Sequence, residues 1–201
     1  MKKQTEELVE KVKVDLKNEM SERRLNHSIS VMEKAVELAR IHGESEDDAA
    51  IAGIMHDIAK EISFEDSLEI AKNNGIEIDE IELINHKLIH GKIGAYLAKE
   101  RYGVAEKIQK AIEYHTETNP EMDRLAKIIF IADKTEDTRK DEGDGIGEER
   151  EMSKIDLDKT IVMIIDGTIK KLINKGKIVH PTELITRNKL LMEMNKNDEN
   201  I

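Results

Sequence analysis

Apolar residues recur at the spacing of an α-helix along almost the whole chain, and this pattern constrains the fold more than any other feature. Leu8, Val12 and Leu16 mark one face of a helix expected over residues 5–18, and the same periodicity returns in later segments. We find no convincing alternation of apolar and polar residues such as a half-buried strand shows. Only two prolines interrupt a sequence rich in helix-forming residues. We therefore expect an all-α fold, a bundle of about eight to ten helices.

Capping residues divide this pattern into separate helices. Serine and aspartate are preferred at helix N-caps, and glycine is preferred just beyond the C-terminus. On this basis one helix runs from Ser21 to Gly43 and another from Ser63 to Gly75. Further helices are expected over residues 46–60, 90–101 and 156–175, with helix starts at Asn119-Pro120 and at Pro181 and a single turn after Asp79.

Residues 140–150 depart from the helical pattern. They hold three glycines and five acidic residues, a composition typical of a mobile loop. We favour a solvated connection on the surface over the alternative, a lid above a functional site.

The composition excludes several classes of protein. The formal net charge is -11 and no long basic stripe occurs, so a nucleic-acid duplex is not an expected partner. There is no cysteine, which excludes disulfides, thiolate nucleophiles and cysteine-based metal sites. The longest apolar runs, at 128–132 and 161–165, are far too short to span a bilayer, and the charged N-terminus is not a signal peptide. We therefore expect a cytoplasmic protein without membrane contact, folded as one domain over residues 1–201.

Histidine and aspartate side chains extend or end several of the apolar stripes. Neighbouring residues on a helix point about 100° apart, so His56 and Asp57 can reach one centre only from a turn at its inward edge. A single such histidine is usually a hydrogen-bonded core residue, and a single buried aspartate is usually a cap. Several inward titratable groups are costly without partners, and one or two divalent cations would satisfy them together. The residues in question are His27, His56, Asp57, His90, His115 and Asp133.

The order and spacing of these residues resemble the HD-domain superfamily of metal-dependent phosphohydrolases. The chain has that superfamily's H…HD…D core, and the two additional histidines resemble those of its dinuclear subgroup. Neighbouring residues look like the bacterial YqeK-type family, and the resemblance covers roughly residues 20–188. The motifs are Arg24-Leu25-Asn26-His27, Met55-His56-Asp57-Ile58-Ala59-Lys60, His90-Gly91-Lys92-Ile93-Gly94-Ala95, Tyr114-His115-Thr116, Ile131-Ala132-Asp133, Gly176-Lys177-Ile178-Val179-His180-Pro181 and Thr186-Arg187-Asn188.

The resemblance implies a single HD-type helical bundle that hydrolyses diadenosine tetraphosphate symmetrically to two ADP by a metal-bound hydroxide. One metal ion would be held by His27, His56, Asp57 and Asp133. The second would be held by His90 and His115, with Asp57 bridging the two ions. The family looks like a di-iron enzyme, while a ligand set of nitrogen and oxygen suits Fe, Mn, Co, Ni or Zn.

The resemblance also implies residues that contact substrate. Lys60 lies one turn after His56 and would act in catalysis with Asp57 by contacting a phosphate oxygen; without the family pattern, a solvent-facing lysine would be the simpler interpretation. The other expected substrate contacts are Arg24, Thr116, Glu136, Arg139 and His180, although Thr116 and His180 could equally be helix caps. Where the family reads A-D-x-x-E-P-G-R followed by F-P-G, this chain has Asp137-Thr138 in place of Pro-Gly and lacks F-P-G.

Two alternatives remain open from the sequence. One is another HD phosphohydrolase, acting on nucleoside mono-, di- or triphosphates or on a cyclic dinucleotide. The other is a non-catalytic sensor that binds a nucleotide and a partner protein. His86 lies four residues before His90, but no glutamate follows it, so the metalloprotease motif is absent and His86 is read as a surface or loop residue. A homodimer is left open.

Overall fold

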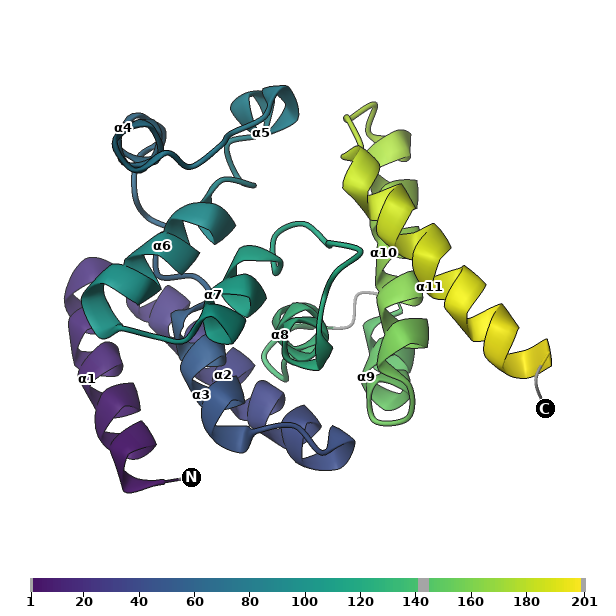
Figure 1. The fold of residues 1–201 in the computed structure, drawn as a ribbon, viewed down its shortest axis with the longest axis horizontal. Coiled ribbons are helices and arrows are strands. Elements are labelled where there is room, and N and C mark those ends of the chain that lie inside the picture. Colours follow the sequence, from purple (N-terminus) through teal and green to yellow (C-terminus); the bar gives the residue numbers. More distant parts are fainter. Residues whose placement is uncertain (1, 141–144, 200–201) are drawn as a thin grey trace.

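The computed structural model describes residues 2–140 and 145–199, and these form eleven helices (Figure 1). None of these residues lies in a strand, so the expected all-α fold is confirmed. Within the same ranges, no helix is both long and apolar enough to cross a membrane. The helices are α1 (Lys3–Glu19), α2 (Glu22–His42), α3 (Glu46–Met55), α4 (Phe64–Asn74), α5 (Glu80–Ile84), α6 (His90–Tyr102), α7 (Glu106–Glu113), α8 (Arg124–Thr135), α9 (Ile146–Ser153), α10 (Leu157–Asn174) and α11 (Pro181–Glu199).

Several helix ends lie where the capping residues predicted them. Gly43 and Gly75 follow α2 and α4 in the left-handed conformation, both with φ of 67°, which glycine adopts without strain. The Ser63 hydroxyl accepts a hydrogen bond from the backbone N–H of Asp66 at the start of α4. Asp79 caps α5 in a reciprocal capping box with Glu82. Local chemistry therefore fixes the boundaries of these elements.

The helix α3 ends at Met55, five residues before the predicted end near Lys60. The ring nitrogen Nδ1 of His56 lies 2.8 Å from the carbonyl oxygen of Gly53. That carbonyl would accept from the N–H of Asp57 if the helix continued. The ring thus replaces the backbone partner, and His56 and Asp57 lie in a turn, the arrangement that two neighbouring residues need to face one centre.

The helix α8 also begins later than predicted, at Arg124 instead of Asn119-Pro120. The Asn119 side chain accepts from the backbone N–H of Glu121, two residues ahead, so it closes a local turn. Asp123 is the N-cap instead, since its carboxylate accepts from the N–H of Ala126. The asparagine-proline signal marked a turn that precedes the helix.

The prediction of a mobile loop over residues 140–150 is wrong for residues 146–150, which belong to α9. The part at 141–144 lies outside the described residues. Arg150 holds α9 against the end of α8: its guanidinium donates to the carbonyl oxygens of Thr135 at 2.8 Å and Glu136 at 2.7 Å. These long-range hydrogen bonds outweigh the weak local helical preference of a glycine-rich segment. This helix also brings the described total above the predicted eight to ten.

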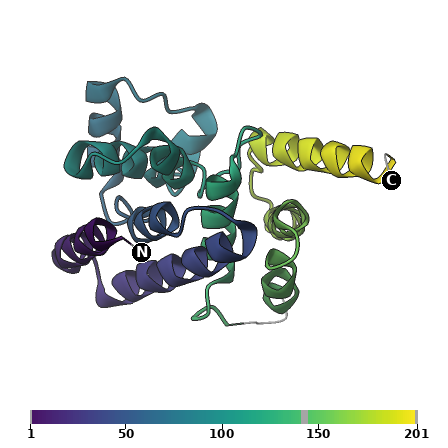
Figure 2. The ribbon, with the colours of Figure 1, turned by 60° about the horizontal axis from the view of Figure 1, so that its bottom comes forward.

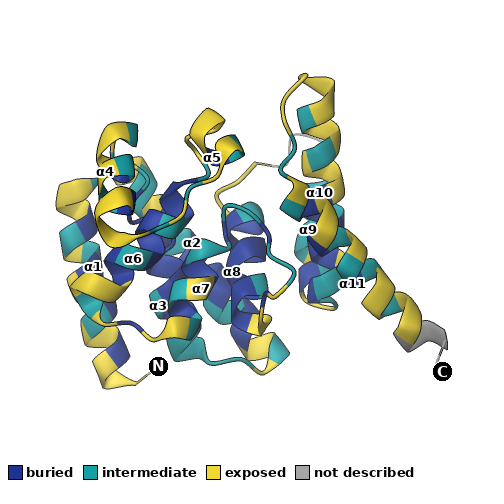
Figure 3. Ribbon diagram, turned by 45° about the horizontal axis from the view of Figure 1, so that its top comes forward, coloured by how far each residue is buried: buried dark blue, intermediate teal, exposed yellow. Residues whose placement is uncertain are grey.

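Helix α8 occupies the middle of the fold. It contacts α2, α3 and α7 on one side and α9 and α10 on the other, while α11 packs on α10 (Figures 1 and 2). Buried residues gather where α2, α3, α7 and α8 meet (Figure 3). Residues 128–133 of α8 are all buried. A helix covered on both sides can place a carboxylate such as Asp133 deep in the protein.

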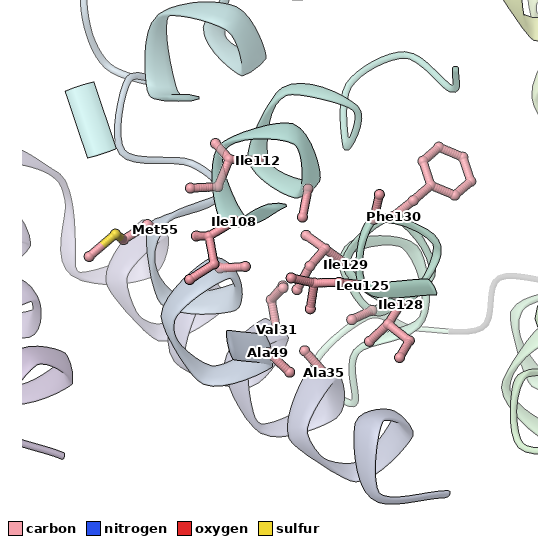
Figure 4. Packing of buried hydrophobic residues seen from close by; sticks show 14 of the residues in the cluster. Val31, Ala35, Ala49, Met55, Ile108, Ile112, Leu125, Ile128, Ile129 and Phe130 are labelled. Atoms are coloured by element: carbon pink, nitrogen blue, oxygen red, sulfur yellow. The ribbon is translucent and has the colours of Figure 1, made fainter. Parts of the chain in front are cut away.

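Aliphatic side chains from four helices form the core beneath this meeting point (Figure 4). Val31 of α2, Ala49 of α3, Ile112 of α7 and Ile129 of α8 are each fully buried. Burying an isoleucine or valine side chain contributes about 1.5–3 kcal/mol. The core therefore holds together the helix ends that carry the histidines and aspartates.

The close crossing of α2 and α3 depends on Gly53. A Cβ atom at this position would lie 2.7 Å from the Cα atom of Met32, which is backbone and cannot move away alone. We expect Gly53→Ala to lower the free energy of unfolding by about 1–3 kcal/mol through overpacking, measured by denaturant unfolding. Gly167→Ala is the matched control, because it lies within α10 and its Cβ would meet nothing within 4 Å. Equal stability of the two variants would contradict the close crossing.

Candidate metal centre

The structure brings together all the residues predicted as metal ligands. His27 comes from α2, His56 and Asp57 from the turn after α3, and Asp133 from α8. His90 begins α6, and His115 lies just after α7. Two groups have ligand atoms within 4.8 Å of one another: His27, His56 and Asp57 form one, and Asp57, His90 and His115 form the other. Asp57 is common to both groups.

The two oxygens of Asp57 face different halves of the site. Oδ1 lies 3.0 Å from Nε2 of His90 and 3.4 Å from Nε2 of His115. Oδ2 lies 3.7 Å from Nε2 of His56. Asp133 joins the half that holds His56, because its Oδ1 lies 3.1 Å from Nε2 of His27 and 3.8 Å from Nε2 of His56. The Asp57 carboxylate therefore lies between two clusters of side chains that could bind a metal ion.

The orientation of each histidine ring fixes which nitrogen can accept. Nδ1 of His56, His90 and His115 faces the carbonyl oxygen three residues earlier in the chain, at 2.8, 2.6 and 2.5 Å. A carbonyl oxygen only accepts, so Nδ1 carries the proton and Nε2 presents a lone pair to the centre. His27 is oriented in the same way, but by a side chain instead of a backbone carbonyl: its Nδ1 lies 3.2 Å from Oε1 of Glu136.

The converging Nε2 lone pairs are not all matched by hydrogen-bond donors, and this deficit indicates a cation. Nε2 of His56 is buried and has no hydrogen-bond partner. Nε2 of His90 and Nε2 of His115 lie 3.0 Å apart, although neither carries a proton in the neutral ring that Nδ1 donation requires. Divalent transition ions bind neutral imidazole and carboxylate together. The residues present therefore fit a metal centre.

Burial keeps most of these imidazoles neutral, which is the form that binds metal. Burial lowers the pKa of His56 to about 4 and also lowers the pKa of His115. His27 differs: burial lowers its pKa, but the hydrogen bond with Asp133 and the negative charges of Asp133 and Asp57 together raise the pKa above its usual value. Burial would raise the pKa of Asp133, but the Lys134 ammonium and the ring of His27 hold it well below its usual range. The aspartate is therefore ionised.

Three of the predicted substrate contacts lie at the rim of the centre. Lys60 Nζ and Arg24 Nη1 each lie 3.3 Å from a different oxygen of Asp57. Arg139 Nη2 lies 3.1 Å from Oδ1 of Asp133. All three side chains are partly exposed, so they can contact both the centre and a ligand that approaches from solvent.

The other three predicted contacts have different surroundings. Thr116 donates its hydroxyl to the carbonyl oxygen of Leu88 at 3.1 Å. Glu136 is buried and faces His27. His180 lies 2.8 Å from Oδ2 of Asp79.

Lys134 was missed by the sequence analysis. Its Nζ lies 2.5 Å from Oδ2 of Asp133 and 3.3 Å from the carbonyl oxygen of His115. Neighbouring positions on a helix point apart, so adjacency to Asp133 predicted no contact. The long side chain turns back over the ring of Phe130, with Nζ 5.2 Å from the ring centroid. The sequence signal that could have suggested this contact is a lysine directly after an inward-facing aspartate.

Known proteins resemble this chain in sequence over the segment that carries these residues. The HD domain family matches residues 24–138, which include every predicted metal ligand. The chain therefore belongs to the HD-domain family.

Similarity to individual members is broader. Two bacterial proteins, each named symmetrical bis(5'-nucleosyl)-tetraphosphatase, are both 35% identical to the chain. The relative from Halalkalibacterium halodurans aligns over 89% of this chain and 94% of its own length. The relative from Bacillus subtilis aligns over 88% and 94%. The crystal structure of a predicted HD superfamily hydrolase involved in NAD metabolism, from Clostridium acetobutylicum, is 39% identical with a TM-score of 0.88, covering 92% of this chain and 97% of that one.

Proposed function

We propose that this chain is a metal-dependent phosphohydrolase that cleaves diadenosine tetraphosphate symmetrically to two ADP. The observation that carries the proposal is Asp57, a buried carboxylate that lies between two groups of imidazole nitrogens. The names of the relatives from H. halodurans and B. subtilis support the same substrate and the same symmetric cleavage.

Two divalent ions would be held by this donor set. His27, His56 and Asp133 would bind the first ion, His90 and His115 the second, and Asp57 would bridge them. When bound, such ions supply Lewis acidity and an activated water at neutral pH. Glu136 would orient the His27 ring by accepting a hydrogen bond from its Nδ1–H group. This positioning role would replace the substrate contact that we expected from the sequence.

The rim cations would bind the phosphate chain. Lys60 and Arg24 lie beside Asp57, and Arg139 lies beside Asp133, so positive charge borders both halves of the centre. Charge builds up on the phosphate oxygens as the bond breaks, and cations fixed at the border of the centre would stabilise that charge. We assign Lys60 and Asp57 to catalysis and Arg24 and Arg139 to substrate binding. Thr116 and His180 would act at a greater distance from the reacting phosphorus.

Further properties are proposed from the family resemblance and from the composition. Iron is the metal that the resemblance implies, with Mn, Co, Ni or Zn as alternatives that the nitrogen and oxygen ligands also accept. We propose that the chain acts as one domain over residues 1–201 in the cytoplasm, on a small dinucleotide. A homodimer is compatible with this function.

The products of hydrolysis test the proposal. Metal-loaded protein incubated with diadenosine tetraphosphate should yield ADP alone, as resolved by anion-exchange chromatography. ATP plus AMP would refute symmetric cleavage. Bound but unchanged nucleotide would favour the sensor. Faster turnover of a nucleoside triphosphate or a cyclic dinucleotide, in the same assay, would favour a different HD phosphohydrolase.

A further inference from the structure

A pocket of about 420 Å³ opens beside the candidate metal centre. Its walls include Arg24, Lys60 and His90, and each of these contacts Asp57 directly. The pocket therefore borders the centre through these three side chains. Its volume lies within the range of about 300–1,000 Å³ that is usual for small-molecule sites.

The outer wall of this pocket carries two stacked rings. The rings of Phe64 and His86 are nearly parallel, at 4°, with centroids 3.4 Å apart. Phe64 is half-buried at the start of α4, and His86 is exposed in the segment before α6. His86 is thus the surface residue that the sequence predicted, but it is held against an aromatic ring. A face-to-face sandwich is not the preferred geometry of two rings, so a third flat ring could join or separate them at little cost.

The same pocket is rich in positive charge. Arg24, Lys60 and Lys87 line it, and none of the described lining residues is acidic, although the chain has 43 acidic residues against 32 basic ones. A second cavity, of about 500 Å³ around Tyr96, is lined by Glu77, Glu106 and Glu113 together with lysines, and by none of the candidate metal ligands. Of these two pockets, only the first combines stacked rings and cationic side chains with residues that contact Asp57.

We propose that the pocket beside Phe64 and His86 binds one nucleoside 5'-diphosphate half of the substrate, an inference that rests on the proposed function for its choice of substrate. The nucleobase stacks on the two rings, and the diphosphate runs past the cations towards Asp57. Stacking accepts any base, so adenine and guanine nucleotides bind alike. A pocket that holds a nucleoside with two phosphates also sets the position of the cut, because the held half leaves as a diphosphate.

Calorimetric titration of the metal-loaded protein with ADP tests the stacking wall. We expect Phe64→Ala and His86→Ala each to weaken ADP binding about tenfold, because stacking of one base on an aromatic side chain is worth about 1–3 kcal/mol. Inorganic pyrophosphate lacks a base, so its affinity should not change. His86→Phe keeps a ring and should keep ADP affinity. Tyr96→Ala, in the second cavity, is the matched control and should leave both affinities unchanged.

Two results would overturn the inference: unchanged ADP affinity in both alanine variants, or an equal loss of ADP and pyrophosphate affinity. His86 is exposed, so His86→Ala tests the wall even if Phe64→Ala does not fold. The titration is independent of turnover. Protein that binds ADP through these rings but leaves diadenosine tetraphosphate intact would reject the proposed function alone. If the protein hydrolyses diadenosine tetraphosphate symmetrically but the Phe64→Ala and His86→Ala variants keep their ADP affinity, only this inference would be rejected.

Discussion

Asp57→Asn is expected to lower kcat/KM for diadenosine tetraphosphate by about 10⁴, the order seen when a central member of a catalytic unit is removed. The two oxygens of Asp57 face opposite groups of imidazoles, so one substitution weakens both proposed metal sites at once. Asparagine keeps the volume but loses the negative charge that balances two divalent ions and the adjacent Lys60 and Arg24. Steady-state kinetics and metal analysis of the purified variant measure both effects.

The matched control for Asp57 is Asp48→Asn, in the first turn of the same helix, α3. This variant should retain metal and activity. Retention of two metal equivalents by Asp57→Asn would contradict the bridging role, even if activity fell. Loss of one equivalent would limit Asp57 to a single ion.

His115→Ala is expected to lose one metal equivalent per chain and to keep the other. Among the groups with converging donors, His115 belongs only to the one that contains Asp57 and His90. A metal acting as a Lewis acid is worth several kcal/mol in the transition state, so activity should fall by about 10²–10³. Elemental analysis of protein purified without chelator measures the stoichiometry.

His56→Ala provides the mirror experiment for the other half of the centre. It should also lose one equivalent, leaving the ion at His90 and His115. A single mononuclear site would give a different pattern, in which one variant empties the protein and the other leaves it fully loaded. The pair of variants therefore distinguishes two sites from one.

The candidate centre could be predicted from the sequence because burial of a titratable group is informative. His27 and Asp133 lie on apolar helical stripes, and a stripe that faces the core turns these side chains inward as well. We then predicted that these inward groups bind metal together, because of their number and because of the family pattern. The structure brings their side chains together, while their role as ligands stays a proposal.

Tertiary contacts account for what could not be predicted. The end of α3 depends on the ring of His56, which takes a carbonyl from the backbone. The helix α9 depends on Arg150 reaching the end of α8. Phe64 and His86 belong to different segments with no common periodicity, and their stacking exists only in the folded chain. Local propensity says nothing about such partners.

Three of the histidines are oriented by a carbonyl of their own turn, only three residues away. Each ring is therefore aligned when its helix end forms, before any ion arrives. The conformational entropy of the ligands is lost during folding of the chain and not during metal binding. Such a candidate site is preorganised: a bound metal would not need to organise the surrounding protein, in contrast to small zinc domains that fold only around their metal. We therefore expect metal ions to enter and leave this candidate centre without unfolding of the chain.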